Sequence, residues 1–254
     1  MVMIRIFTVF IGLVLTAVTT SSFSDSEAGD VKVSYVDAYR LVPEFHFVSK
    51  GVFRSARPSQ PGAIDALATA GIRTIINLQG PDGEIFGIGG FVQKHFEPGE
   101  GDVEIEAERQ AATQNKIHKM FFFNVPVVSI IGSYIDDVEA VGIRNALRIM
   151  HDPKYQPVVA HCEHGHDRTG MLIALYRVLY EGKTIAEAYQ EMVDMGHSGI
   201  VDHIITDPVG EFFLEEGCRI RKEKIAAGIL KSSELDPECI WLDELANTTY
   251  PNPL

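Results

Sequence analysis

One ten-residue segment constrains the fold of this chain more than any other: HCEHGHDRTG, residues 161–170, here called the cysteine segment. The apolar residues 157–160 before it predict a strand, and the apolar stretch from Thr169 to Tyr180 after it predicts a helix closed by Gly182. A strand that enters a helix through a compact, glycine-containing turn forms a cradle for phosphate, because backbone N–H groups and the positive helix end point to one place. We therefore expect an anion site at residues 162–168.

The residue types in this turn suit nucleophilic chemistry on phosphorus. Cysteine attacks as its thiolate, and the N–H groups and helix end would stabilise that charge on Cys162. Arg168 carries a planar guanidinium that can hold two phosphoryl oxygens, and Gly165 permits the tight curve. Thr169 can donate its hydroxyl to the sulfur and help it leave. The candidate catalytic residues are Cys162, Arg168 and Thr169, and the candidate substrate-binding residues are Glu163, His164, Gly165, His166, Asp167 and Arg168.

Two other interpretations of the cysteine segment compete with this one. The possible metal ligands are His161, Cys162, His164, His166 and Asp167. Alternate residues of one loop seldom converge on a metal without distant partners, and the other cysteines come singly along the chain. A buried structural cysteine followed by a polar loop would leave the clustered histidines and acids without a purpose. We expect neither a metal nor an organic cofactor.

Strand and helix patterns alternate along the rest of the chain. Residues 48–55 form an extended run with a turn at Lys50–Gly51, and 74–78 and 120–127 have the pattern of buried strands. Helices are predicted from about 61 to 70, 103 to 116, 136 to 150, 184 to 195 and 208 to 230. These patterns predict one α/β domain with a central, mostly parallel sheet flanked by helices.

The expected domain covers residues 45–231 and includes an insertion-like segment, 80–120, that is rich in glycine and acids. Residues 103–116 within it are expected to form an exposed, acidic helix. Residues 25–44 are expected to be a flexible lead-in, and residues 232–254, with their acids and prolines, a loosely attached C-terminal tail.

Residues 1–24 have the order of a secretory signal peptide. Arg5 precedes an apolar run, Ile6 to Val18, and Ser22-x-Ser24 offers a cleavage site before Asp25. The run is shorter than the ~20 residues that a helix needs to span a bilayer. We expect a secreted or periplasmic protein without stable membrane insertion after cleavage.

Cysteine count and charge limit the remaining possibilities. The odd count, Cys162, Cys218 and Cys239, leaves at least one thiol unpaired in an oxidising compartment. If Cys218 pairs with Cys239, Cys162 is the free thiol; alternatively, all three stay reduced. The formal net charge of −13, without any block of consecutive basic residues, argues against nucleic acid as a partner.

The cysteine segment resembles the signature loop of the protein tyrosine phosphatase superfamily. Residues 52–59, 71–78 and the stretch up to Gly196 are similar to bacterial secreted or periplasmic dual-specificity phosphatases and their atypical plant and fungal relatives. The resemblance implies a dual-specificity-phosphatase-like fold and hydrolysis of phosphate monoesters. In that scheme Cys162 attacks phosphorus, Arg168 binds the phosphoryl oxygens and an aspartate protonates the leaving oxygen.

The resemblance leaves three candidates for this acid. Asp136 and Asp137 lie upstream of Cys162, as the acid does in the family, although Asp136 to Glu139 also has the form of a helix-capping box. Asp167 is similar in position to the loop aspartate of myotubularin-like lipid phosphatases.

Several substrate classes are compatible with the resemblance. Phosphotyrosine on protein is preferred, with phosphoserine or phosphothreonine possible. An inositol polyphosphate or phosphoinositide is the alternative, because Glu163 resembles the same position in cysteine phytases. An inactive phosphate-binding module is a third hypothesis, against which Cys162, Arg168 and Thr169 together argue. Arg54 and Arg57 could reach a substrate or be merely solvated, and His197 could border the site or end a helix.

Overall fold

The computed structural model describes residues 35–80, 100–127, 135–197 and 207–249. The predicted signal peptide, the first part of the expected lead-in and the glycine-rich stretch 81–99 lie outside these residues. The expectations for them stay predictions.

A five-stranded sheet forms the centre of the domain. Its strands are β1 (His46–Ser49), β2 (Val52–Ser55), β3 (Thr74–Asn77), β4 (Phe121–Asn124) and β5 (Val158–His161). They lie in the order β1-β2-β5-β3-β4, with β1 antiparallel to β2 and every other pair parallel. The prediction of a mostly parallel sheet is confirmed, and the turn at Lys50–Gly51 joins β1 to β2, with Gly51 at a positive φ of 77°.

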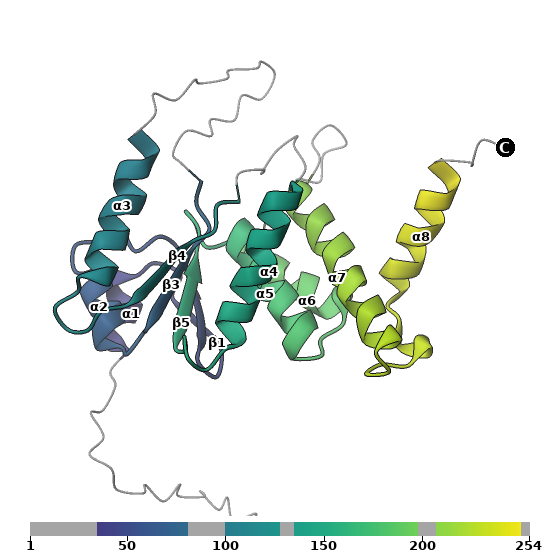
Figure 1. Ribbon diagram of the computed structural model, residues 1–254, viewed down its shortest axis with the longest axis horizontal. Coiled ribbons are helices and arrows are strands. Elements are labelled where there is room, and N and C mark those ends of the chain that lie inside the picture. The colour runs from purple at the N-terminus through teal and green to yellow at the C-terminus, as the bar shows by residue number, and fades with distance from the viewer. Residues whose placement is uncertain (1–34, 81–99, 128–134, 198–206, 250–254) are drawn as a thin grey trace, which may run out of the picture. The chain divides into compact units, whose positions relative to one another are not determined.

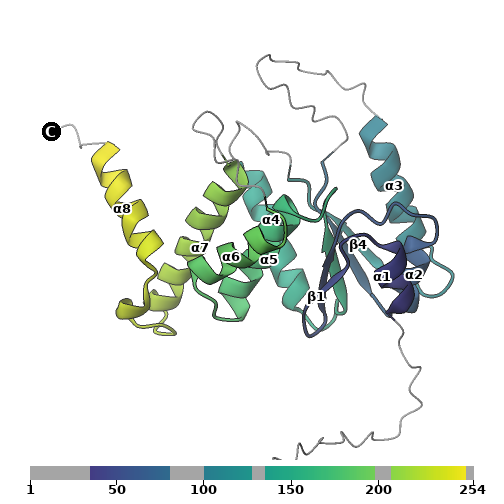
Figure 2. The same cartoon turned by 180° about the vertical axis from the view of Figure 1, so that it is seen from behind.

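Helices cover both faces of the sheet (Figure 1). One side carries α1 (Val36–Leu41), α2 (Ala63–Thr69) and α3 (Glu100–Thr113), and the other carries α4 (Asp137–His151) and α5 (Asp167–Tyr180). Against α5 pack α6 (Ile185–Asp194) and α7 (Pro208–Ala226), and the view from behind shows the same division (Figure 2). The chain ends in a short 3-10 turn (Ser232–Glu234) and α8 (Pro237–Thr249).

The core has one apolar cluster on each side of the sheet. Along β5, Val158 and Ala160 belong to the cluster under α4 and α5, whereas Val159 belongs to the cluster under α1 and α2. Successive strand side chains point to opposite faces, and helices cover both. This is why β5 is apolar from Val158 to Ala160 and why the sequence marks it so clearly.

Strand β4 is less buried than its apolar sequence suggests. It pairs with β3 at the edge of the sheet, and Phe121 is 43% exposed. The strand predicted within residues 120–127 is present, but the prediction that it is buried was wrong. Among the described strands, β4 has a neighbour on one side only, so part of it remains exposed.

Helix ends follow the predicted signals closely. Asp136 with Glu139, and Thr184 with Glu187, form the capping boxes that begin α4 and α6. Helix α5 begins at Asp167, two residues before the predicted start. An acidic residue in the first turn interacts favourably with the positive helix end.

Two segments that were expected to be flexible or loosely attached contain helices in the structure. Helix α1 lies within residues 25–44, where a flexible lead-in was expected. In the expected tail, α8 is joined to α7 by a Cys218–Cys239 disulfide, and the buried Asp236 pairs with Arg221 at 2.5 Å. Asp236 also accepts a hydrogen bond from the Ile185 N–H. Together with Leu235 and Leu242, which pack against the core, these contacts attach the segment.

Within the described ranges, none of the helices is both long enough and apolar enough to cross a membrane.

Candidate active site

The cysteine segment lies where β5 ends and α5 begins, as predicted. Cys162 is 3% exposed and is the free thiol of the three cysteines. Gly165 has a φ of +78°, and a Cβ placed there would lie 2.7 Å from the Ser55 carbonyl oxygen at the end of β2. Only glycine fits this position, because a side chain would meet both backbone strain and a backbone clash.

Arg54, on β2, binds the backbone of the turn through its side chain. Its side chain is buried, and its Nη2 donates a hydrogen bond of 2.6 Å to the Gly165 carbonyl. Burial lowers the pKa of the Arg54 guanidinium, and attraction to Cys162 is the strongest influence in the opposite direction. Of the two alternatives left open for Arg54, the exposed and merely solvated arginine is excluded, because its side chain is buried and its charge interacts with Cys162.

Arg168 is held at the other side of the segment. Its Nη1 donates to the Val127 carbonyl at 3.2 Å. This contact fixes one nitrogen of the guanidinium near the start of α5. The remaining N–H groups can donate hydrogen bonds to phosphoryl oxygens.

His161 is fixed from two sides. Its Nδ1 lies 3.3 Å from the Cys162 carbonyl oxygen, and its Nε2 lies 2.8 Å from Oε1 of Glu108 on α3. The Asn77 amide donates to the other oxygen of Glu108 at 3.0 Å. A carboxylate from the insertion-like segment therefore holds the imidazole of His161 at the end of β5. Helix α3 was expected to be exposed, yet this face of it is buried against the sheet.

Glu163, directly after Cys162, contacts two residues outside the cysteine segment, Gln79 and Arg57. Its Oε2 accepts a hydrogen bond of 2.5 Å from the Gln79 amide and lies 3.4 Å from Nη1 of Arg57. The other end of the Arg57 guanidinium pairs with Glu104 on α3. Burial lowers the pKa of Arg57, but the charges of Glu163 and Glu104 and their hydrogen bonds outweigh it and raise that pKa.

Asp167 is bound by a histidine from a distant turn. Nδ1 of His197 lies 2.6 Å from Asp167 Oδ1, and Nε2 lies 3.0 Å from Asp207 Oδ2, at the start of α7. Burial alone would lower the pKa of His197, but the hydrogen bonds and charges of the two aspartates raise it to about 9. The imidazole between them is therefore a cation at neutral pH.

The two remaining histidines of the segment lie with their ring centroids 6.5 Å apart. His166 packs against Gly196, where an added Cβ would come within 3.0 Å of its ring. The turn after α6 thus contacts the cysteine segment at both His166 and Asp167.

Two buried hydroxyls beside the turn, Ser55 Oγ and Thr169 Oγ1, have no hydrogen-bond partner among the described residues. The expected bond from Thr169 to the Cys162 sulfur is not formed in this structure. The assistance of Thr169 to the leaving sulfur stays a prediction.

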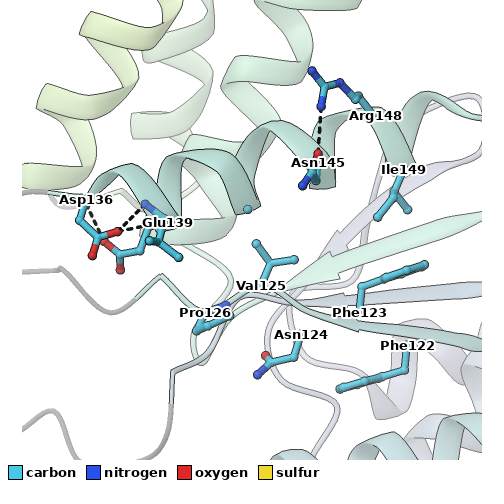
Figure 3. A pocket seen from close by; sticks show the side chains of 12 residues that line it. Phe122, Phe123, Asn124, Val125, Pro126, Asp136, Glu139, Asn145, Arg148 and Ile149 are labelled. Atoms are coloured by element: carbon cyan, nitrogen blue, oxygen red, sulfur yellow. Dashed lines mark hydrogen bonds between the residues drawn. The ribbon is translucent and has the colours of Figure 1, made fainter.

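Asp136 caps α4, and its Oδ1 accepts hydrogen bonds from the Val138 and Glu139 N–H groups. It lines a hollow of about 960 Å³ between β4 and α4, shown in Figure 3, where Phe123 and Val125 face the helix. Asp137 is the exposed first residue of α4. Residues 128–134, which precede this cap, lie outside the described ranges, so the choice among the three candidate acids stays open.

Across the described ranges, histidine, cysteine, aspartate and glutamate side chains form no group of three or more that could hold a metal ion.

Sequence reasoning missed several residues around the site, and one signal could have found two of them. Asn77 and Gln79 end or follow β3, and the carboxyl ends of neighbouring parallel strands meet at the same edge of a sheet. The contacts of Glu104 and Glu108 depend on how α3 packs, and the sequence carries no local signal for that. His197, for which the sequence left open a place at the border of the site or at a helix end, contacts Asp167 of the cysteine segment.

A model of the tyrosine phosphatase family matches residues 37–200, more than half of the chain.

Two curated proteins are similar over shorter stretches. Dual specificity protein phosphatase TpbA of Pseudomonas aeruginosa is 34% identical over 68 residues, 27% of this chain and 29% of TpbA. Inositol diphosphatase DSP2 of Arabidopsis thaliana is 28% identical over 160 residues, 56% of this chain and 60% of DSP2. The chain thus spans less than two thirds of the length of either.

Among solved structures, the core catalytic domain of the PP-IP phosphatase Siw14 from S. cerevisiae, in complex with citrate, is similar at 18% identity and a TM-score of 0.45. The likeness covers 75% of this chain and 97% of that one.

Proposed function

Because this chain belongs to the tyrosine phosphatase family, we propose that it hydrolyses phosphate monoesters through a phosphocysteine intermediate. The observation that carries the proposal is the free thiol of Cys162 at the turn between β5 and α5, with Arg54 held beneath the turn and Arg168 at its end. Backbone N–H groups, the positive helix end and two guanidinium groups all favour a thiolate and a bound phosphoryl group there.

The reaction takes two steps. The Cys162 thiolate attacks phosphorus, the bond to the leaving oxygen breaks, and an aspartic acid gives that oxygen a proton. Water then attacks the phosphocysteine and gives a proton back to the aspartate; the phosphorus–sulfur bond breaks, which releases inorganic phosphate and restores the thiolate. Arg168 holds the equatorial oxygens in both steps. Asp136 is our preferred acid over Asp137, and Asp167 is the third candidate.

The preferred substrate is phosphotyrosine on protein, with phosphoserine or phosphothreonine also possible, and it is supported by the family and by the similarity to a dual specificity phosphatase. An inositol phosphate is the second candidate, since the longer of the two similarities is to an inositol diphosphatase.

One assay tests the chemistry. The purified protein is given an aryl phosphate, a phosphotyrosine peptide and inositol hexakisphosphate in the presence of EDTA, beside Cys162→Ser. We expect turnover by the wild type and none by the variant. Activity that survives in Cys162→Ser would exclude the phosphocysteine, and loss of wild-type turnover in EDTA would support a metal-dependent reaction.

We also propose that the protein works after export, in the periplasm or outside the cell. Residues 1–24 have the pattern of a signal peptide, and a Cys218–Cys239 disulfide persists best in an oxidising compartment. Sequencing the N-terminus of the mature protein tests this: a start near Asp25 is expected, and an intact Met1 in the cell interior would contradict it.

A further inference from the structure

Arg57 is a cation beside the cysteine segment that no step of the proposed reaction uses. Its backbone N–H donates to the Glu163 carbonyl at 3.1 Å, so the residue lies against the loop that would hold the phosphoryl group. Its side chain is 22% exposed. An arginine at such a place can bind a second phosphate of a substrate, because its planar fork matches phosphate geometry.

In this chain, carboxylates already occupy that arginine. One nitrogen of the guanidinium pairs with Glu104 and the other lies 3.4 Å from Glu163. The second polar group at this edge, the Gln79 amide, also donates to Glu163. Any further phosphate arriving here would have to displace two carboxylates from Arg57 and remain close to their negative charges.

Both carboxylates are positioned by the fold. Glu104 lies on α3 one turn before Glu108, whose contact with His161 holds the helix against the end of the sheet. The side chain of Glu163 is held by the Gln79 amide, after β3, and by Arg57, after β2. The side chains of Glu104 and Glu163 remain 50% and 42% exposed, so their charges face an approaching ligand.

Resting on the proposed function, we propose that Glu104 and Glu163 pair with Arg57 and so prevent it from binding a second phosphate of a substrate. The enzyme would therefore select substrates with a single phosphoryl group. Highly phosphorylated molecules such as inositol polyphosphates are disfavoured, because their additional charges meet carboxylates instead of a free guanidinium. This argues from the geometry against the inositol reading that the identity of Glu163 suggested, and it gives the acidic helix α3 a part in specificity.

Binding tests the proposal without requiring turnover. The affinity of Cys162→Ser for inositol hexakisphosphate is measured by calorimetry, with and without Glu104→Gln. We expect binding about tenfold tighter with Glu104→Gln, because one nearby charge is removed and Arg57 gains a free face. Added Arg57→Gln should remove the gain. Equal affinities, or no binding with either protein, would overturn the proposal.

Glu106→Gln is the matched control. Glu106 lies on the same helix and has the same charge, but it pairs with Arg109. Its substitution should leave the affinity within twofold. An equal gain from Glu106→Gln would mean that net charge alone is responsible, which also overturns the assignment to Arg57.

Turnover supplies a second readout. In proteins with Cys162 intact, Glu104→Gln should raise kcat/KM for inositol hexakisphosphate relative to that for a phosphotyrosine peptide by a similar factor. A protein that hydrolyses neither compound would refute the proposed function, whereas the binding result would still decide whether Glu104 prevents Arg57 from binding a second phosphate. An unchanged ratio in an active enzyme would refute the specificity proposal alone.

Discussion

The buried imidazole of His197 and the partly exposed carboxylate of Asp167 form an ion pair, with Nδ1 2.6 Å from the carboxylate oxygen of the residue next to Arg168. The second nitrogen of the ring is bound by Asp207 at the start of α7. One cation thus joins the start of α5, the turn after α6 and the start of α7. Asp167 accepts a hydrogen bond from this cation.

The ion pair predicts how stability depends on pH. Folding raises the pKa of His197 from 6.5 to about 9. Its contribution is therefore fully present below pH 6.5 and is lost as the pH rises through about 9; for a shift of this size it amounts to about 3 kcal/mol at most. Urea unfolding at pH 6 and pH 9.5 measures it. His197→Gln should flatten the difference, while His46→Gln, at an exposed pair with Glu44, should not. Equal pH dependence in all three proteins would contradict this role.

Substituting two glycines with similar φ, Gly182 and Gly165, distinguishes the effect of backbone strain from that of a steric clash at the site. Gly182→Ala (φ +75°, no neighbour within 4 Å) should cost about 1 kcal/mol of stability from strain alone. Gly165→Ala adds the contact with the Ser55 carbonyl, so the turn must shift, and turnover of an aryl phosphate should fall roughly 100-fold. Comparable activities in the two variants would show that the turn tolerates the shift.

Two substitutions of Asp136 distinguish its role as a helix cap from a role as the general acid. Asparagine caps a helix as well as aspartate, so Asp136→Asn should keep the stability, whereas Asp136→Ala should lose about 1 kcal/mol. If Asp136 is the acid, Asp136→Asn should slow phenyl phosphate much more than a substrate with a good leaving group. Equal slowing of both substrates would point to Asp137 or Asp167, which the same pair of assays tests.

The disulfide should stabilise the C-terminal helix without serving the chemistry. Cys218 and Cys239 are 21 residues apart, and removing a cross-link over such a loop typically costs about 3 kcal/mol. The double variant Cys218→Ser/Cys239→Ser should unfold at lower urea while keeping kcat for an aryl phosphate at low temperature. A tenfold loss of kcat in the folded variant would show that α8 influences the site.

Local chemistry explains which predictions held. The strand before Cys162 is buried on both faces and is uniformly apolar, and capping boxes mark the starts of α4 and α6 with side chains that lie within one turn. The edge position of β4 and the attachment of α8 were missed because both depend on which element lies beside them, and composition does not report that.

The sequence by itself determined the turn that holds Cys162 and Arg168, the glycine at positive φ and the parallel sheet beneath them, because each follows from a short pattern of residue types. Only the tertiary structure decided what surrounds them. It buried Arg54 under the turn, placed Glu104 and Glu108 of α3 beside Arg57 and His161, and set His197 between two aspartates. The physical reason is that charges act through space: carboxylates far from the cysteine in sequence control its surroundings once packing brings them within a few ångströms.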